Sequence, residues 1–442
     1  FRRVLFRSIS WLKMKTNREI LKFAFPAIIE NFLQMLVGVS DTMIVAHLSL
    51  SAVAAVSFAN NLITVYQAIF IALGTIVSSL FAKVLIAKKV EENPKRLINS
   101  ATKLTFLIGL ALGIVSVVEA RPILYLLGAR QQVLELSIIY LSLVGGLIVL
   151  LALMTTFGAF LRADGNTKTP MWASFFASLL NLILSIVFIF VFHLGVLGTA
   201  LGAVIARFIG TLFLYYKLKD KRPDFRFYKE KLDHQLIKLS LPATGERLSM
   251  RLGDLLIMMI IVRLGERVFA GNAIGESITQ FNYMPVFGMA TVTVILVAQA
   301  AAENSIENVK AYIKKTYWLA TIMMFVIGLA LLLTANILNQ FFTTDRIAMN
   351  ASTTVILFSF LATFFVTGAT TYTAAFQGIG NTKLPFYATT LGMFGIRLLL
   401  GAFLALGLKL GLEGVWLAVL LDNLFRFIFL KIKFNQSLTS KI

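Results

Sequence analysis

Carboxylates inside long apolar runs are the residues of this sequence best placed to do chemistry. Six acids share this setting: Glu30, Asp41, Glu246, Asp254, Glu276 and Asp422. A charged side chain costs about 2.5–3.5 kcal/mol at the centre of a membrane helix, so each of these acids needs a partner or a task. A carboxyl group without a fixed partner can take up and release a proton or bind a cation. The sequence therefore predicts ion binding as its chemistry.

Asp41 is the first candidate for that task. It lies six residues before His47, which marks the edge of its apolar run. The structural alternative is a fixed ion pair with an arginine or a hydrogen bond to an amide. Glu276 has no basic residue nearby on its helix and is the second candidate for cation coupling.

Two further acids have a basic neighbour in their own helix. Asp254 follows Arg251 by three residues and Asp422 precedes Arg426 by four, spacings at which side chains meet on a helix surface. We expect both acids to be structural. Five arginines fall inside apolar runs, where they would neutralise such acids or receive an anionic head group: Arg207, Arg247, Arg251, Arg397 and Arg426.

The elements that must hold these residues are membrane helices. Of the 442 residues, 58% are hydrophobic and 14% charged, with a mean hydropathy of +0.84, more apolar surface than a soluble core could bury. A membrane helix needs about 20 apolar residues. Twelve runs qualify, near 23–46, 52–81, 98–118, 136–161, 171–192, 194–216, 239–262, 268–300, 316–338, 351–376, 386–408 and 412–430. We predict an all-α polytopic protein with twelve transmembrane helices, and the lipid bilayer as its solvent.

The distribution of Lys and Arg orients these helices. If the N-terminus is inside, the inner segments hold thirty basic residues and the outer loops six, so the positive-inside rule places both termini in the cytoplasm. We expect the inner (plasma) membrane of a prokaryote. The net charge of +20 then reflects topology, and no nucleic-acid partner is expected. Because Met14 reads as a natural start, residues 1–13 are interpreted as a non-native leader.

The chain repeats itself after about 216 residues. Pro26-Ala27 with Glu30 recurs as Pro242-Ala243 with Glu246, and the segment 165–170 (GNTKTP) recurs as 380–385 (GNTKLP). We interpret both segments as turns at which a proline begins the next helix. Six helices per half predict two pseudo-symmetric lobes in a parallel repeat: residues 14–216, a cytoplasmic linker 217–238, and residues 239–442.

These motifs resemble the multidrug and toxic compound extrusion (MATE) family. The resemblance rests on FPAIIE at 25–30 leading to VSDT at 39–42, on Leu161-Arg162 before GNTKTP, and on their second-half equivalents. It implies two lobes with a central cleft, a proton or sodium gradient as the energy source, and lipophilic, often cationic drugs as cargo. It also implies that Asp41 is the acid that the coupling ion occupies. Residues 351–376 contain no acid, which favours the DinF-like over the NorM-like branch.

The resemblance extends to Asn181, where the family often has an aspartate four residues later. Here that position is Ser185, and the threonine expected in the sixth helix is Ala203. Sodium needs several oxygen ligands and a proton needs one acceptor, so we favour the proton. Asn181 is assigned to cation coupling, with a helix-packing hydrogen bond as the alternative.

The substrate cleft is expected to include residues from both halves. Arg397 stands at the repeat position of Asn181, and Met or aromatic side chains can repack around varied ligands. Glu30 and Glu246, as repeat equivalents, suggest a shared architectural task at the cleft. The cleft assignments are Glu30, Glu246, Met284, Phe287 and Arg397.

We therefore expect a monomeric secondary exporter of small lipophilic substrates, without a cofactor other than the coupling ion, H⁺ or Na⁺. A flippase for a lipid-linked precursor is the alternative, because it shares the fold class and a cationic cleft suits a pyrophosphate group. An enzyme is not expected, because the spans contain no convergent set such as a Ser-His pair or a His-Glu-x-x-His run. A passive channel is not favoured, because it would need a ring of repeated polar residues and the spans lack one.

Overall fold

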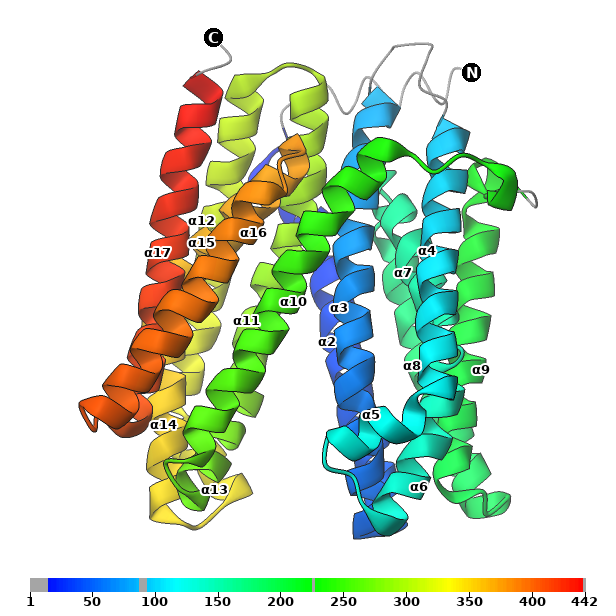
Figure 1. The fold of residues 1–442 in the computed structure, drawn as a ribbon. Helices are drawn as coiled ribbons and strands as arrows, with labels where there is room; N and C mark the ends of the chain where they lie inside the picture. The colour runs from blue at the N-terminus through cyan, green and yellow to red at the C-terminus, as the bar shows by residue number, and fades with distance from the viewer. Residues whose placement is uncertain (1–14, 87–93, 225–226, 440–442) are drawn as a thin grey trace. The chain divides into compact units, whose positions relative to one another are not determined.

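The computed structural model describes residues 15–86, 94–224 and 227–439, so the expected leader 1–13 lies outside the described residues. The side chains of several residues of the first helix, Asp41 among them, also lie outside the description. Within the described part, every regular element is helical (Figure 1). The chain divides into two compact units, which we call the first-half unit (Ile29–Ser240) and the second-half unit (up to Ile28, and Leu241–Ile442).

The first-half unit is built from long helices with short connections. The first helix, α2 (Asn17–Ala46), begins in the second-half unit and continues into the first-half unit, because the division falls between Ile28 and Ile29. The expected lobes 14–216 and 239–442 stay a prediction. The other helices are α3 (Leu50–Ile86), α4 (Pro94–Val118), α5 (Ala120–Leu126), α6 (Gln131–Tyr140), α7 (Val149–Ala163), α8 (Lys168–Ile186) and α9 (Gly195–Lys217).

The second-half unit repeats this series. Its helices are α10 (His234–Val262), α11 (Glu266–Ala302), α12 (Ile306–Leu333), α13 (Ala335–Phe342), α14 (Arg346–Leu361), α15 (Thr363–Ile379), α16 (Lys383–Thr390) and α17 (Gly411–Thr439). Residues 234–240 of α10 still belong to the first-half unit. The helix that starts as α16 continues in wider π-helical turns, η5 (Leu391–Leu400) and η6 (Phe403–Gly407). Similar segments follow α6, at η1 (Leu141–Gly145), and α8, at η2 (Val187–Val191).

The predicted twelve transmembrane helices are confirmed. Seven described helices are long and apolar enough to cross a membrane, and two further spans are bent pairs, α6/η1 with α7 and α14 with α15. The three long helices α2, α10 and α17, of 29 or 30 residues, lie at the remaining three predicted runs. The runs 136–161 and 351–376, expected as single helices, are bent by 40° and 57°. Gly145 and Gly146 lie at the first bend, as is common for kinks. The second contains neither Gly nor Pro.

The two repeated Gly-Asn-Thr-Lys segments form the turns that were predicted. Gly165 and Gly380 have φ values of 85° and 88°, a left-handed conformation that glycine adopts without strain. The next helices begin at Lys168 and Lys383. Pro170 and Pro385 therefore lie in the first turn, where a missing N–H costs no helical hydrogen bond.

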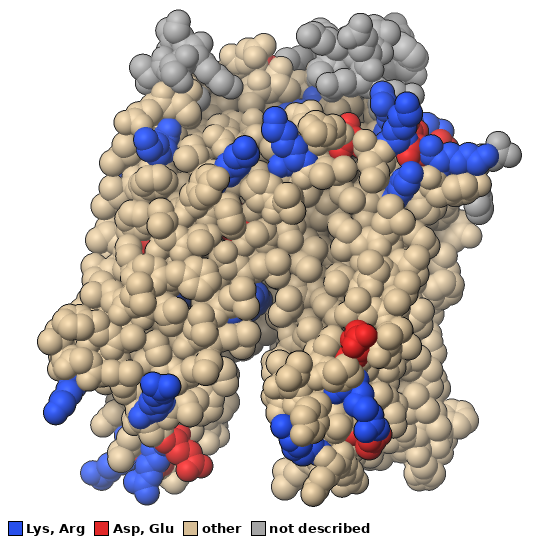
Figure 2. All heavy atoms as spheres, viewed as in Figure 1, with Lys and Arg blue, Asp and Glu red and all other residues tan. Residues whose placement is uncertain are grey.

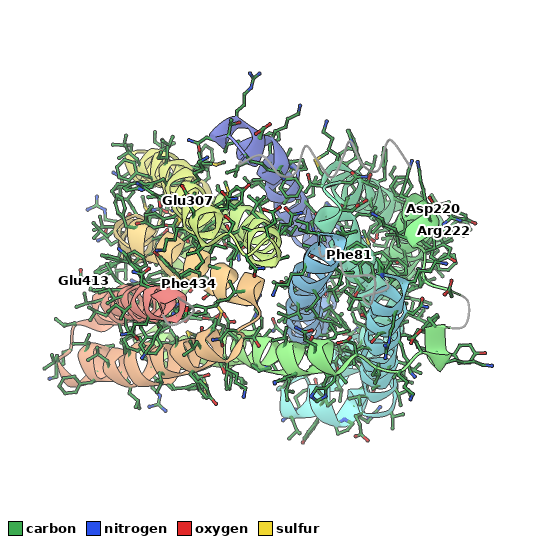
Figure 3. All side chains as sticks on the ribbon, turned by 90° about the horizontal axis from the view of Figure 1, so that it is seen from above. Phe81, Asp220, Arg222, Glu307, Glu413 and Phe434 are labelled. Atoms are coloured by element: carbon green, nitrogen blue, oxygen red, sulfur yellow. The ribbon has the colours of Figure 1, made fainter. Side chains whose placement is uncertain are left out.

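Charged side chains gather toward the ends of the helices, and an apolar band lies between them (Figure 2). Figure 3 looks from above onto the ends of the helices, and it labels Asp220 and Arg222 in the linker that follows α9. This linker is tied to α4, because Asp224 accepts hydrogen bonds from Asn99 Nδ2 at 3.0 Å and Lys95 Nζ at 3.3 Å. These contacts hold the pKa of the Asp224 carboxyl below its usual range.

Candidate ion-coupling site

Glu30 on α2 forms a partly buried ion pair within the first-half unit. Arg162 Nη1, on α7, donates to both carboxylate oxygens, at 3.0 and 2.9 Å, and Ser174 Oγ on α8 donates to Oε1 at 3.4 Å. Both charged side chains are 13% exposed. Gly158 lies one turn before Arg162, where an added Cβ would be 3.1 Å from Nη1. The glycine thus leaves room for the guanidinium, and three helices meet at this carboxylate.

Glu246 on α10 occupies the equivalent place in the second-half unit, with a neutral side chain as its hydrogen-bond donor, while Arg247 and Arg426 act on it through their charge. Gln377 Nε2 on α15 donates to Oε2 of Glu246 at 3.1 Å, and both residues are buried. Gln377 stands three residues before Gly380, as Arg162 stands three before Gly165. The repeat therefore keeps both the acid and the position of its partner, and exchanges a guanidinium for an amide.

A network of four charged side chains, Asp254, Arg397, Asp422 and Arg426, joins three helices of the second-half unit. Arg397 on η5 contacts Asp422 on α17 with Nη2 at 2.8 Å and Asp254 on α10 with Nη1 at 3.2 Å. Arg426 Nη2 lies 3.0 Å from the same Asp422 oxygen. Asp422 is fully buried, whereas the Asp254 side chain is 49% exposed. The two acids and two arginines balance, so the network needs no further ion for neutrality.

This network corrects one prediction and confirms another. The expected pairing of Asp422 with Arg426 on one helix turn is present. Among the described ion pairs, however, Asp254 pairs with Arg397 on a different helix and not with Arg251. The reason is the burial of Arg397, which is 12% exposed and therefore needs carboxylate partners more than the exposed Arg251 does.

The first-half unit has neutral residues where this network stands. Counting back 216 residues from its members gives Gly38, Asn181, Ala206 and Gly210. Asn181 is buried and accepts a hydrogen bond from Ser185 Oγ at 3.3 Å. A Cβ on Gly202 would lie 2.8 Å from that hydroxyl, so α8 and α9 pack tightly there. The hydrogen bond from Ser185 lies within α8 and does not decide between a helix-packing bond and ion coupling, so the role of Asn181 stays a prediction.

The remaining predicted residues lie on α2 and α11. The backbone of Asp41 is helical within α2, and its side chain lies outside the described residues. Glu276 on α11 is exposed and takes part in none of the ion pairs of the described chain. Met284 is half-buried and Phe287 is 40% exposed, with its ring stacked on Tyr283. Their assignment to the cleft stays a prediction.

The sequence reasoning missed Arg162 and Gln377 as the partners of the repeated glutamates. A signal was available, because both stand three residues before the repeated Gly-Asn-Thr-Lys motif. Positions that repeat together with the glutamates are candidates to contact them. The repeat alone does not show that α7 and α15 pack beside the helices that carry the two glutamates.

Known proteins share this fold and sequence pattern. The family model MatE matches residues 26–187 and 242–403, and both ends of the second match lie 216 residues beyond those of the first, in agreement with the repeat. The probable multidrug resistance protein NorM of Thermotoga maritima is 26% identical over 425 residues, 93% of this chain and 90% of that protein. The uncharacterised transporter YisQ of Bacillus subtilis is 25% identical over 91% of both chains. A crystal structure of MATE in the straight conformation has a TM-score of 0.88 at 21% identity, over 96% of this chain and 97% of that one. Since the family model covers most of both six-helix halves, this chain belongs to the MatE family of membrane transporters.

Proposed function

We propose that this protein is a multidrug exporter that uses a cation gradient, in the first place protons, to move lipophilic and often cationic compounds out of the cell. The observation that carries the proposal is the match of the MatE model to both halves. The name of the Thermotoga maritima relative, a probable multidrug resistance protein, supports drugs over a lipid-linked precursor as cargo.

The state of the acids supports Asp41 as the coupling residue. Within the first-half unit, Glu30 is held by Arg162 and Ser174. In the second-half unit, Asp254 and Asp422 are paired with arginines and Glu246 accepts a hydrogen bond from Gln377. Glu30, Asp254 and Asp422 therefore cannot take up a proton without leaving an arginine unpaired. Glu246 is set aside as the repeat equivalent of Glu30, with a shared architectural task. On the family resemblance we assign Asp41 to the coupling ion, with Glu276 as the second choice.

The proposed cycle is alternating access. A proton taken up by Asp41 from outside favours release of cargo outward, and loss of that proton toward the cytoplasm resets the transporter. Coupling requires the proton and the cargo to favour different conformations by a few kcal/mol. The element we propose to change is α2, which carries Pro26 inside the helix. Pro26 lies two residues before the point at which α2 passes from one compact unit to the other.

The proton is preferred to sodium because the first half offers few hard oxygen ligands beside Asn181. Ser185 and Ala203 stand where the family pattern has a carboxylate and a hydroxyl. The absence of an acid between 351 and 376 supports the DinF-like branch. The basic inner segments support cytoplasmic termini in a plasma membrane.

The test is transport by the purified full-length protein in liposomes. Efflux of a fluorescent lipophilic cation is followed under an imposed pH gradient, an imposed sodium gradient, or neither. We expect efflux with the pH gradient and its loss when a protonophore collapses that gradient. Efflux driven only by sodium would contradict proton coupling, and no efflux under either gradient would contradict the drug exporter.

A further inference from the structure

A groove lined by aromatic rings and lysines lies on the second-half unit. It has a volume of about 480 Å³, within the range of ligand sites. It is formed by α12, α15 and α17, near the end of these helices that carries the C-terminus (Figure 1). Seen along the helices, Glu307 marks the start of α12 and Phe434 the corresponding part of α17 (Figure 3). We call it the inner aromatic groove.

The wall of the groove is aromatic. Tyr317 on α12 stacks on Phe427 of α17, with ring centroids 5.8 Å apart and 16° between the ring planes. Tyr372 on α15 lies 6.0 Å from the same Phe427 ring. Trp318 borders the groove and is 48% exposed. Such amphipathic rings are typical of the boundary between head groups and acyl chains.

The rim of the groove is positively charged. Lys310 and Lys314, one turn apart on α12, and Lys431 on α17 line it, and its lining residues include no acid. The three lysines are exposed, and none takes part in an ion pair with a described residue. The contact recorded for Lys431 is with the ring of Phe427, 5.5 Å from the centroid. This charge is complementary to an anion, not to a cationic drug.

An apolar track continues from the groove along α12. Trp318, Ile322, Val326, Leu329 and Leu333 are all exposed, and their spacing of three or four residues places them on one helix face. At 1.5 Å per residue the track is about 22 Å long, which exceeds half of a hydrocarbon core of about 30 Å. A single acyl chain of one leaflet can lie along it.

We propose that the inner aromatic groove is a binding site for an anionic phospholipid of the cytoplasmic leaflet. The three lysines hold the phosphate group, the aromatic wall receives the glycerol region, and one acyl chain follows the exposed face of α12. Basic pockets between membrane helices on the cytoplasmic side bind anionic head groups in this way. The assignment to the cytoplasmic leaflet rests on the proposed orientation of the helices. Lipid binding itself does not depend on the transport activity.

The test is a competition between lipids on the purified full-length protein. Equal amounts of phosphatidylglycerol and phosphatidylcholine are added in detergent, and bound lipid is counted by native mass spectrometry. We expect phosphatidylglycerol to be retained preferentially. Replacing Lys310, Lys314 and Lys431 by Gln should weaken that binding by at least about ten-fold. The matched control replaces Lys219, Lys238 and Lys383 by Gln, which removes the same charge from exposed positions outside the groove.

Two further arms separate a lipid from a free anion. Inorganic phosphate is compared with phosphatidylglycerol for its effect on the melting temperature, and Trp318→Ala removes part of the aromatic wall without touching charge. We expect phosphatidylglycerol, and not inorganic phosphate, to raise the melting temperature. Trp318→Ala should reduce that rise. Equal effects of phosphate and lipid, or equal loss of lipid in the groove and control variants, would overturn the proposal. If the triple variant does not fold, Lys431→Gln alone is measured against Lys383→Gln.

Discussion

Both halves of the chain place a glutamate inside a membrane helix, but different side chains contact the two glutamates. Glu30 is balanced by the guanidinium of Arg162, whereas Glu246 receives one hydrogen bond from the amide of Gln377. Conversely, the second half carries a network of four charged residues where the first half has Gly38, Asn181, Ala206 and Gly210. The repeated fold thus fixes where the two glutamates stand, and the residues around each glutamate decide which group donates to it.

The largest expected effect comes from breaking the charge network. Arg397→Gln leaves Asp422, which is fully buried, with only Arg426 as an ion-pair partner, and removes the ion-pair partner of Asp254. Loss of one partner of a buried ion pair costs about 3–5 kcal/mol. We expect a large drop in melting temperature in detergent. The double variant with Asp422→Asn should recover part of it, and a double variant as unstable as the sum of both single ones would contradict the pairing.

The next largest effect is the difference in stability loss between neutralising Glu30 and neutralising Glu246. Glu30→Gln leaves the Arg162 guanidinium without its counter-charge and should cost about 3 kcal/mol of unfolding free energy. Glu246→Gln keeps an amide that can accept from Gln377 and should cost about 1 kcal/mol or less. Melting temperatures of the two variants, measured side by side, check this difference. Equal losses would show that the two partners do not distinguish the halves.

A smaller effect is expected when the glutamate–arginine pair of the first half is introduced at the equivalent position of the second half. Gln377→Arg would place a guanidinium beside Glu246, but Thr373 stands four residues earlier, where the first half has Gly158. The larger side chain should therefore overpack the site, at a cost of about 1–3 kcal/mol. Adding Thr373→Gly should return part of the lost melting temperature. A single Gln377→Arg variant more stable than wild type would refute this steric reading.

The smallest effect concerns the linker of the first-half unit. Asp224 is held by Asn99 and Lys95, which lower its pKa. A lowered folded-state pKa contributes stability that is present at neutral pH and is lost as pH falls below about 4, through the folded-state pKa. Asp224→Asn should therefore speed proteolysis of the segment 217–238 slightly at pH 7, with no difference from wild type at the lowest pH. Unchanged cleavage at pH 7 would show that the contact does not hold the linker.

The sequence predicted the twelve helices because run length and hydropathy report directly on a bilayer. The repeat predicted the equivalence of Glu30 and Glu246, and helical spacing predicted the pair of Asp422 and Arg426. The bends within 136–161 and 351–376 were missed, because π-helical turns and kinks leave little trace in hydropathy. The contacts of Glu30 with Arg162 and of Asp254 with Arg397 were missed as well. Their partners lie 132 and 143 residues apart, and helix packing, not sequence spacing, brings them together.

The central claim, that an acid of the first half couples transport to protons, is tested most directly by proton movement itself. A pH-sensitive dye inside liposomes reports protons moved by the reconstituted protein when a lipophilic cation is added. Wild type, Asp41→Asn and Glu276→Gln are compared. We expect cargo-dependent proton movement in wild type and in Glu276→Gln, and its loss in Asp41→Asn with the melting temperature unchanged. Proton movement that survives Asp41→Asn and disappears in Glu276→Gln would contradict this claim and assign coupling to the second half.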